Sequence, residues 1–228
     1  MTAPASGPIS AGETPERPVA VVTAAGGMMG TAISTLLATS GHRLVLNDRR
    51  DCLDALAAQL RGRGSEVETV VADVADTEGA EATVRAALLR WGRVDVLVNV
   101  AGGIKGPVDN PLWDITAEQW SRTVSVNLDS AFFCTQQAAK AMMAHGSGRI
   151  VNVASTSWAG SPLHAHYAAA KAGLVSLTRS AAQQLGNPLG RPNEPEDIAE
   201  AVAFLLGNGA RNISGQLLTV AGGLNPAL

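Results

Sequence analysis

The sequence predicts an α/β fold, in which a doubly wound parallel sheet lies between two layers of helices to give three α/β/α layers. Short apolar runs alternate with stretches of helical periodicity along most of the chain. The apolar runs are continuous, as expected for strands that are buried on both faces. A glycine-rich turn at residues 26–30 follows the first run, at the strand end where open sheets of this kind bind ligands.

The individual elements follow from these patterns in chain order. We expect strands at residues 19–23, 44–46, 67–71, 94–98 and 149–153, and a closing strand at residues 216–220. We expect helices where apolar residues recur at helical spacing, at residues 32–41, 52–60, 80–91, 116–145, 167–185 and 198–206. The stretch at 116–145 is long and could be broken near Asn127.

The first 18 residues differ in composition from the rest of the chain. Residues 1–18 contain four prolines and no apolar core, which argues against a secretory signal or a transit peptide. We expect this segment to be a disordered tail. We expect residues 19–228 to form one domain, because a chain of 228 residues suits a single α/β core.

The composition narrows the classes of partner. A net charge of −3 and an aromatic content of 4% argue against a nucleic-acid partner. No apolar run reaches the ~18–20 residues that a membrane span needs, so we expect no membrane partner. Cys52 and Cys134 show no metal-ligand spacing. They predict no metal site and a reducing compartment, of which the cytoplasm is the default.

The first turn and the second strand predict a dinucleotide site. Glycines at residues 26–30 would let backbone N–H groups approach a diphosphate, although a tight turn without a ligand is an equal alternative. Asp48 lies at the spacing expected for an acid that binds a ribose 2′-hydroxyl. An acid there repels a 2′-phosphate, so NAD is favoured, while NADP stays possible because Arg49 could pair with a phosphate. A helix N-cap is the alternative role for Asp48.

Side chains after the later strands could extend this site. Asp73 could accept a hydrogen bond from an adenine amino group or remain a loop acid, and small residues at 99–103 would leave room for a flat ring. Lys105 could cover the mouth of the pocket, although a solvated lysine is the simpler interpretation. His166 could line a substrate pocket, but a solvated loop position is more common for such a residue.

Tyr167 and Lys171 are the clearest candidates for chemistry. Residues four apart on a helix share one face, and an ammonium beside a phenol favours the phenolate. Such a pair can move a proton to or from a carbonyl or alcohol oxygen. Ser155, just past the fifth predicted strand, could hold the same oxygen. A plain surface contact is the alternative for a tyrosine and a lysine at this spacing.

Together these motifs resemble the short-chain dehydrogenase/reductase family, in the branch called classical that includes 3-oxoacyl-thioester reductases, over residues 19–223. The resemblance implies a Rossmann sheet of seven strands and assembly as a homotetramer or homodimer. Tyr167 would be the general acid/base, Lys171 would stabilise its phenolate and hold the nicotinamide ribose, and Ser155 would orient the substrate carbonyl. Asn127 would hold a water that links Lys171 to solvent. The residues expected to contact the cofactor are Thr23, Gly26, Gly27, Met29, Gly30, Asp48, Asp73, Val74, Asn99, Ala101, Gly102, Tyr167 and Lys171.

The chain departs from the family pattern in three places. Ala24 and Met28 replace the first two glycines of the family's turn, and only Gly30 matches. The spacing from Ser155 to Tyr167 is one residue shorter than usual, which leaves Ser157 as a weaker alternative to Ser155. The family's sixth strand and substrate lid are absent between residues 186 and 187. Either a mobile segment is missing from the sequence, or the deletion is real and leaves a damaged or non-catalytic protein.

The function that this pattern predicts is that of an NAD(P)-dependent oxidoreductase. It would transfer a hydride between nicotinamide and a small-molecule carbonyl or secondary alcohol, with Tyr167 as the general acid/base. The alternative is a non-catalytic dinucleotide-binding or partner subunit of the same fold, which the altered turn and the absent strand favour.

Overall fold

The central sheet has five parallel strands in the order β3-β2-β1-β4-β5. The computed structural model describes residues 17–107, 109–185, 195–216, 218 and 220. The strands are β1 (Val19–Val22), β2 (Arg43–Asp48), β3 (Val67–Val71), β4 (Val96–Asn99) and β5 (Arg149–Asn152). The strand order reverses between β1 and β4, so ligands are expected at the carboxyl ends of these two strands.

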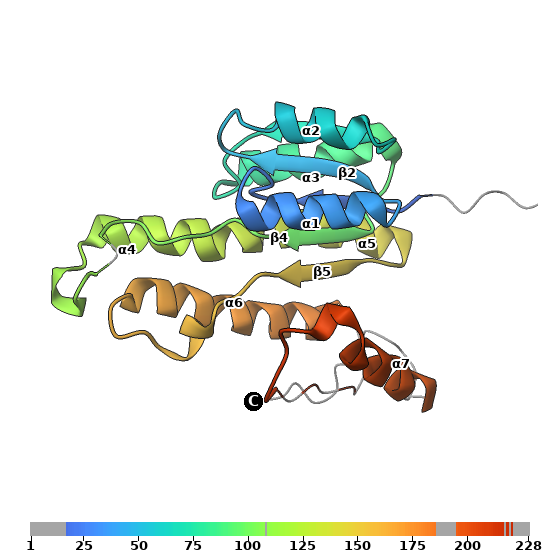
Figure 1. The fold of residues 1–228 in the computed structure, drawn as a ribbon. Helices are drawn as coiled ribbons and strands as arrows, with labels where there is room; N and C mark the ends of the chain where they lie inside the picture. The colour runs from blue at the N-terminus through green and yellow to red at the C-terminus, as the bar shows by residue number, and fades with distance from the viewer. Residues whose placement is uncertain (1–16, 108, 186–194, 217, 219, 221–228) are drawn as a thin grey trace, which may run out of the picture.

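Helices cover both faces of the sheet, as Figure 1 shows. Helices α1 (Met28–Thr39) and α2 (Asp54–Arg61) lie on one face, and α3 (Thr77–Trp91) and α5 (Ser130–His145) lie on the other. Within β1, Val19 and Val21 pack toward α3 and α5, whereas Ala20 and Val22 pack toward α1 and α2. All four residues of β1 are buried, and the predicted three-layer α/β fold is confirmed.

Local signals explain where the helices begin and end. The Asp76 side chain caps α3 by accepting a hydrogen bond from the Gly79 N–H at 2.7 Å. Helix α3 ends at Gly92, whose φ of 73° suits glycine. Helix α4 (Ala117–Val124) begins with a capping box between Thr116 and Gln119. These signals lie in the sequence, which is why the predicted element positions agree with the observed ones within a few residues.

The long helical stretch is broken near Asn127, as predicted. Helix α4 passes into a single π-helical segment, η2 (Ser125–Asp129), before α5 begins. A π turn widens the helix locally and is common at functional sites. The remaining elements are η1 (Leu112–Asp114), η3 (Thr156–Ala159), α6 (Ala165–Gln184), α7 (Pro195–Leu206) and η4 (Asn208–Ala210).

The sheet stops at β5 in the part of the chain that the structure describes. Strand β5 pairs with β4 along one edge, and no described residue pairs with its other edge. The seven strands implied by the family resemblance are therefore not all present among the described residues. The predicted closing strand at 216–220 is not observed at residues 216, 218 and 220, and residues 217 and 219 lie outside the described set. Residues 1–16 of the predicted tail also lie outside it.

Helix α7 presents apolar side chains to solvent. Val202, Leu205 and Leu206 of this helix are exposed to 49%, 42% and 83%. In Figure 1, α7 lies beyond the end of α6, away from the sheet. Apolar residues at helical spacing usually form the buried face of a helix. Among the described residues, these side chains of α7 are not buried.

Candidate functional site

A cavity of about 290 Å³ opens at the carboxyl ends of the strands, where the strand order reverses. Its volume lies near the lower end of the ~300–1,000 Å³ that is usual for small-molecule sites. Several of the predicted cofactor contacts line it: Gly27, Met29, Gly30, Asp48, Asp73, Val74, Ala101 and Gly102. The fold therefore brings together residues that are distant in the sequence at one site.

The altered glycine turn keeps the shape that a diphosphate site needs. Ala24, in place of the first glycine, has a φ of 49° and is the only described non-glycine residue in the left-handed region. A Cβ atom at Gly30 would collide with the carbonyl oxygen of Ala24, so the close approach there requires glycine. Met28, in place of the second glycine, lines the cavity and is 93% exposed.

Helix α1 begins without a side-chain cap, at Gly27. The first N–H groups of a helix have no partner within the helix. Because these donors and the positive end of the helix dipole face the cavity, the turn can hold an anionic group such as a diphosphate. The donor set of this turn therefore fits a dinucleotide, even though two of its glycines are replaced.

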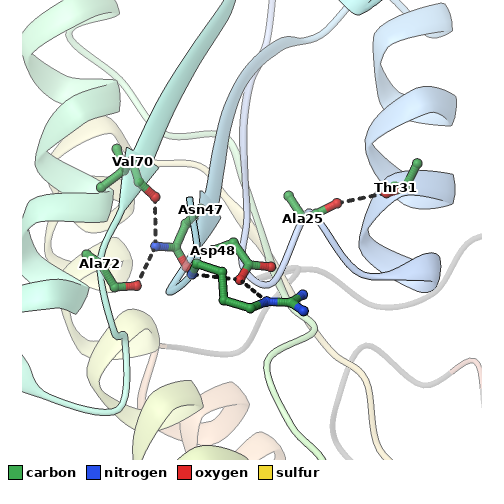
Figure 2. A network of polar contacts seen from close by, with 7 residues as sticks. Ala25, Thr31, Asn47, Asp48, Val70 and Ala72 are labelled. Atoms are coloured by element: carbon green, nitrogen blue, oxygen red, sulfur yellow. Dashed lines mark hydrogen bonds and ion pairs between the residues drawn. The ribbon is translucent and has the colours of Figure 1, made fainter. Parts of the chain in front are cut away.

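Asp48 ends β2 and is only 4% exposed. Its Oδ1 atom accepts hydrogen bonds from the Arg50 backbone N–H at 3.0 Å and from Arg50 Nε at 3.3 Å (Figure 2). This contact raises the pKa of the Arg50 guanidinium. The Oδ2 atom faces Gly26, where a Cβ atom would come within 3.1 Å of it. The N-cap position of helix α2 is Leu53, so Asp48 is not the N-cap of that helix.

Asn47 fixes the adjacent strand end. Its Nδ2 atom donates hydrogen bonds to the carbonyl oxygens of Val70 at 3.2 Å and Ala72 at 3.0 Å, as Figure 2 shows. These bonds join the carboxyl ends of β2 and β3 beside the cavity. Asn47 and Arg50 were not among the predicted site residues, although their position next to Asp48 was a usable signal.

Five predicted cofactor residues do not line the cavity: Thr23, Gly26, Asn99, Tyr167 and Lys171. The Thr23 hydroxyl oxygen accepts hydrogen bonds from the N–H groups of Val100 at 2.9 Å and Ala101 at 3.1 Å, so it braces the loop after β4. A Cβ atom at Gly26 would collide with Cys52 Sγ and crowd Asp48 Oδ2, so glycine at this position leaves room for these two side chains.

Asn99 is the third of these residues, and its side chain points into a hydrogen-bond network. Its Nδ2 atom donates to Asn152 Oδ1 at 2.8 Å and to Thr135 Oγ1 at 3.3 Å. Asn152 Nδ2 donates in turn to Thr178 Oγ1 at 2.9 Å on α6. A direct cofactor contact by Thr23, Gly26 or Asn99 therefore stays a prediction, and the observed contacts support the walls of the site.

The four predicted catalytic residues lie on elements that adjoin one another. Lys171 Nζ donates a hydrogen bond to the Val153 carbonyl oxygen at 2.8 Å and lies 5.8 Å from the centroid of the Tyr167 ring. Lys171 is 3% exposed, and burial lowers its pKa. A Cβ atom at Gly102 would come within 2.7 Å of Asn127 Oδ1 and 3.3 Å of Lys171 Nζ. Gly102 thus borders both the cavity and the Lys171 ammonium of α6.

Asn127 and Ser155 are held by local hydrogen bonds. Asn127 Nδ2 donates to the carbonyl oxygens of Gly103 at 2.7 Å and Thr123 at 2.8 Å, and its Oδ1 accepts from the Gly103 N–H at 3.0 Å. The Ser155 hydroxyl accepts from the Ser157 N–H at 3.2 Å and caps η3, which lies against α6. Ser155 and Tyr167 are both partly exposed, as groups that meet a substrate must be.

The structure also places His166 and Lys105. His166 is fully buried, and neither ring nitrogen has a hydrogen-bond partner, so it is neither a solvated loop residue nor a pocket residue. Its place on the inner side of α6 could not be read from the sequence because the helix begins at Ala165, ahead of the predicted start. Lys105 does line the cavity.

The comparisons with known proteins agree with this geometry. A family profile described as short chain dehydrogenase matches residues 18–188. The chain belongs to the short-chain dehydrogenase family. It is 31% identical over 240 aligned positions to a 3-oxoacyl-acyl-carrier-protein reductase of Synechocystis sp., covering 90% of this chain and 96% of the relative. It is 34% identical over 246 positions to a cis-4-hydroxycyclohexanecarboxylate dehydrogenase of Sinomonas cyclohexanicum, covering 93% and 98%.

A solved structure supports the same assignment. A short-chain dehydrogenase/reductase from Burkholderia phymatum in complex with NAD matches with a TM-score of 0.70 and 31% identity, covering 74% of this chain and 60% of that one. This short-chain dehydrogenase is thus an NAD(P)-dependent oxidoreductase of the 3-oxoacyl-reductase-like branch. No observation favours the non-catalytic alternative.

The length of the alignment is relevant to the family's sixth strand, which the sequence analysis finds to be absent. The alignment with the Synechocystis relative runs over 240 positions, whereas this chain has 228 residues, of which 90% are aligned. The relative therefore carries residues within the aligned region that this short-chain dehydrogenase lacks.

Three further properties of the described residues concern membranes, metals and thiols. No helix there combines the length and apolarity needed to cross a bilayer. No group of three or more His, Cys, Asp or Glu side chains in the same residues could hold a metal ion. Both cysteines are free, and burial raises the pKa of the Cys134 thiol to about 12.

Proposed function

We propose that this short-chain dehydrogenase interconverts a small carbonyl compound and its secondary alcohol, with Asn127, Ser155, Tyr167 and Lys171 as the catalytic residues. The observation that carries this proposal is the placement of Lys171. Its buried ammonium lies beside the Tyr167 ring and borders Gly102, which lines the cavity. A ligand that fills the cavity and reaches past Gly102 would meet both side chains.

The proton chemistry follows from this arrangement. A nicotinamide cofactor supplies the hydride in reduction and accepts it in oxidation. In reduction, the Tyr167 hydroxyl donates its proton to the carbonyl oxygen, and in oxidation the phenolate takes a proton from the alcohol. The Ser155 hydroxyl, at the start of η3, holds the same oxygen. Lys171 stabilises the phenolate electrostatically, and burial strengthens that interaction because the local dielectric constant is low.

Asp48 favours NAD as the cofactor in this proposal. The turn at residues 26–30 and the start of α1 would hold the diphosphate, and Asp48 Oδ2 faces the same space. Since Arg50 engages only Oδ1, the other oxygen is available to a ribose hydroxyl. Asp73, which also lines the cavity, could accept a hydrogen bond from the adenine amino group.

The substrate class is proposed from the relatives. One relative is named a 3-oxoacyl-acyl-carrier-protein reductase and another a hydroxycyclohexanecarboxylate dehydrogenase. Both names describe a carbonyl and secondary-alcohol pair on a carbon skeleton with a nearby carboxyl or thioester group. We therefore propose 3-oxoacyl thioesters and small cyclic or linear hydroxy acids as the first compounds to test.

The decisive experiment separates binding from turnover. NADH binding is measured by nicotinamide fluorescence, and turnover is measured with the compounds above, for the wild type and for Tyr167→Phe. We expect Tyr167→Phe to bind NADH as the wild type does and to lose at least about 100-fold in kcat. Wild-type turnover on none of the compounds, or unchanged turnover in Tyr167→Phe, would contradict the proposal.

A matched pair of serine variants tests the substrate contact. Ser155→Ala should lower kcat by about 10-fold or more, because it removes a hydrogen bond to the reacting oxygen. Ser157→Ala removes a hydroxyl two residues away and should leave kcat within about twofold if Ser155 has the catalytic role. The reverse result would transfer that role to Ser157.

We also propose that the protein acts in the cytoplasm as a homotetramer or homodimer. Trp120, Phe132 and Met143 on α4 and α5 are 45%, 42% and 66% exposed, and side chains of this kind are typical of subunit interfaces. Both thiols are free, as is usual in a reducing compartment. Light scattering after size-exclusion chromatography tests the assembly, and a monomer would contradict it.

A further inference from the structure

The loop that follows β4 borders both the cavity and the catalytic helix. Ala101, Gly102 and Lys105 of this loop line the cavity. A Cβ atom at Gly102 would come within 3.3 Å of Lys171 Nζ, so the loop backbone lies beside the ammonium. The position of the loop therefore decides how well the ammonium is shielded from water.

Helix α4 and the π turn that follows it hold this loop at residues 103 and 105. The Asn127 side chain accepts a hydrogen bond from the Gly103 N–H at 3.0 Å and donates one to the Gly103 carbonyl oxygen at 2.7 Å. Thr123 holds the loop two residues further on, because its Oγ1 atom accepts a hydrogen bond from the Lys105 N–H at 3.1 Å. The loop is thus fixed from one side by two side chains of the same helical stretch.

Thr123 takes part in both of these attachments. Its carbonyl oxygen accepts a hydrogen bond from Asn127 Nδ2 at 2.8 Å, while its hydroxyl oxygen accepts the bond from Lys105. Thr123 is fully buried. A donor that loses its acceptor at a buried site destabilises the conformation in which it is buried. Loss of the Thr123 hydroxyl would therefore release the loop at residue 105.

The Lys171 ammonium depends on this enclosure. Its Nζ atom donates to the Val153 carbonyl oxygen, lies 5.8 Å from the centroid of the Tyr167 ring and adjoins Gly102. Burial lowers the pKa of Lys171, with no contribution from a charge on the described residues. The attraction between an ammonium and a phenolate weakens when water enters, because the effective dielectric constant rises. A displaced loop would thus stabilise the Tyr167 phenolate less well.

We propose that Thr123 is a positioning residue for the Tyr167 and Lys171 pair, because its hydroxyl fixes the loop that shields the Lys171 ammonium. The inference rests on the proposed function, in which the Tyr167 phenolate is the base in alcohol oxidation. Thr123 does not line the cavity, so it acts through the loop and through Asn127 and not by contact with a ligand. Its effect should appear in the pH dependence of turnover.

The test compares two variants at this position in the full-length protein. It follows oxidation by NAD of a 3-hydroxyacyl thioester or of cis-4-hydroxycyclohexanecarboxylate, whichever the wild type turns over faster. Thr123→Val keeps the shape of the side chain and removes the oxygen. We expect it to lower kcat by about 5- to 20-fold and to move the rising limb of the pH profile up by about 0.5–1 pH unit. Thr123→Ser keeps the oxygen and should leave kcat within about threefold and the rising limb in place.

Thr83→Val is the matched control. Thr83 is also fully buried, and its Oγ1 atom donates a hydrogen bond to the Gly79 carbonyl oxygen at 2.7 Å within α3 and not to the loop. The control therefore makes the same chemical change at an equally buried site. We expect it to leave kcat within about twofold and the pH profile unchanged, whatever its melting temperature below that of the wild type.

The outcomes distinguish this inference from the proposed function. An unshifted pH profile in Thr123→Val would overturn the inference even if kcat falls, because a merely structural loss lowers kcat without moving the profile. The same shift in Thr83→Val would also overturn it. If Thr123→Val does not fold, Thr123→Ser decides the matter, since a shifted profile with the oxygen retained contradicts the role of the hydroxyl. A wild type that binds NADH but turns over neither compound would overturn the proposed function, and this inference with it.

Discussion

Strands β1 and β5 both pair with β4, yet their surroundings differ. Strand β1 has a parallel partner on each edge and helices over both faces, and all four of its residues are buried. Strand β5 has a partner on one edge only among the described residues, and Arg149 and Val151 are exposed. The cavity is lined by the turn that follows β1. The helix that carries Tyr167 and Lys171, α6, lies beside β5 (Figure 1).

This difference separates the region proposed to bind the cofactor, around β1, from the region proposed to carry the catalytic residues, around β5 and α6. The residues proposed to hold the diphosphate and the adenosine ribose, at the turn after β1 and at Asp48, adjoin the part of the sheet with buried clusters on both faces, and the residues of those clusters precede α6. Helix α6 is tied to the sheet by the bond from Lys171 to Val153 and by the bond from Asn152 to Thr178. Binding should therefore tolerate changes at the β5 edge that turnover does not.

The largest effect is expected at the turn beside β1. Gly30→Ala would place a Cβ atom against the backbone of Ala24 and Ala25, which cannot move without distorting the turn. We expect NADH affinity to fall at least 10-fold and unfolding free energy to fall by about 1–3 kcal/mol, as in other overpacked sites. Urea unfolding and fluorescence titration measure both. Gly62→Ala, at the end of α2 with a φ of −62°, is the control and should change neither.

The same truncation, valine to alanine, in β1 and in β5 tests the difference in burial between the two strands. Val21→Ala removes a fully buried side chain of β1 and should cost about 2 kcal/mol of unfolding free energy. Val151→Ala removes a side chain that is 51% exposed and should cost less than about 1 kcal/mol. Equal losses in urea unfolding would mean that the face of β5 that carries Val151 is covered in solution, for instance by another subunit.

A smaller effect is expected at the link between β5 and α6. Asn152→Ala removes the hydrogen bonds to Asn99 and Thr178 and should cost about 1 kcal/mol of stability. Because α6 carries Tyr167, we expect kcat to fall several-fold while the dissociation constant of NADH stays within about twofold. A parallel loss of cofactor binding would show that the two parts of the molecule are not independent.

The smallest effect is a gain in stability. Ala24 has a φ of 49°, which costs an ordinary residue about 1–2 kcal/mol relative to glycine. Ala24→Gly should raise the unfolding free energy by about 0.5–1 kcal/mol, since the added freedom of the unfolded chain offsets part of the relief. Thermal unfolding measures it, and a decrease in melting temperature would show that the turn is not strained.

Much of the fold could be predicted because its signals are local. The run at residues 67–71 became a strand with the same bounds, and the weak point near Asn127 became a π turn. The spacing of Tyr167 and Lys171 placed them on one helix without any tertiary information. The candidate site was less predictable. Arg50, rather than Arg49, pairs with Asp48, and this depends on the direction in which the chain leaves β2.

What the sequence determined by itself is the order of strands and helices and the residue types at the strand ends, because periodicity, caps and glycine positions act over a few residues. Tertiary structure decided which of those residues share a surface. It gave Thr23 and Asn99 hydrogen bonds that support the walls of the site, buried His166, and brought Arg49, Lys105 and Asp73 to one cavity. Such pairings arise only when parallel strands bring distant segments to one edge, where burial and charge act across space and not along the chain.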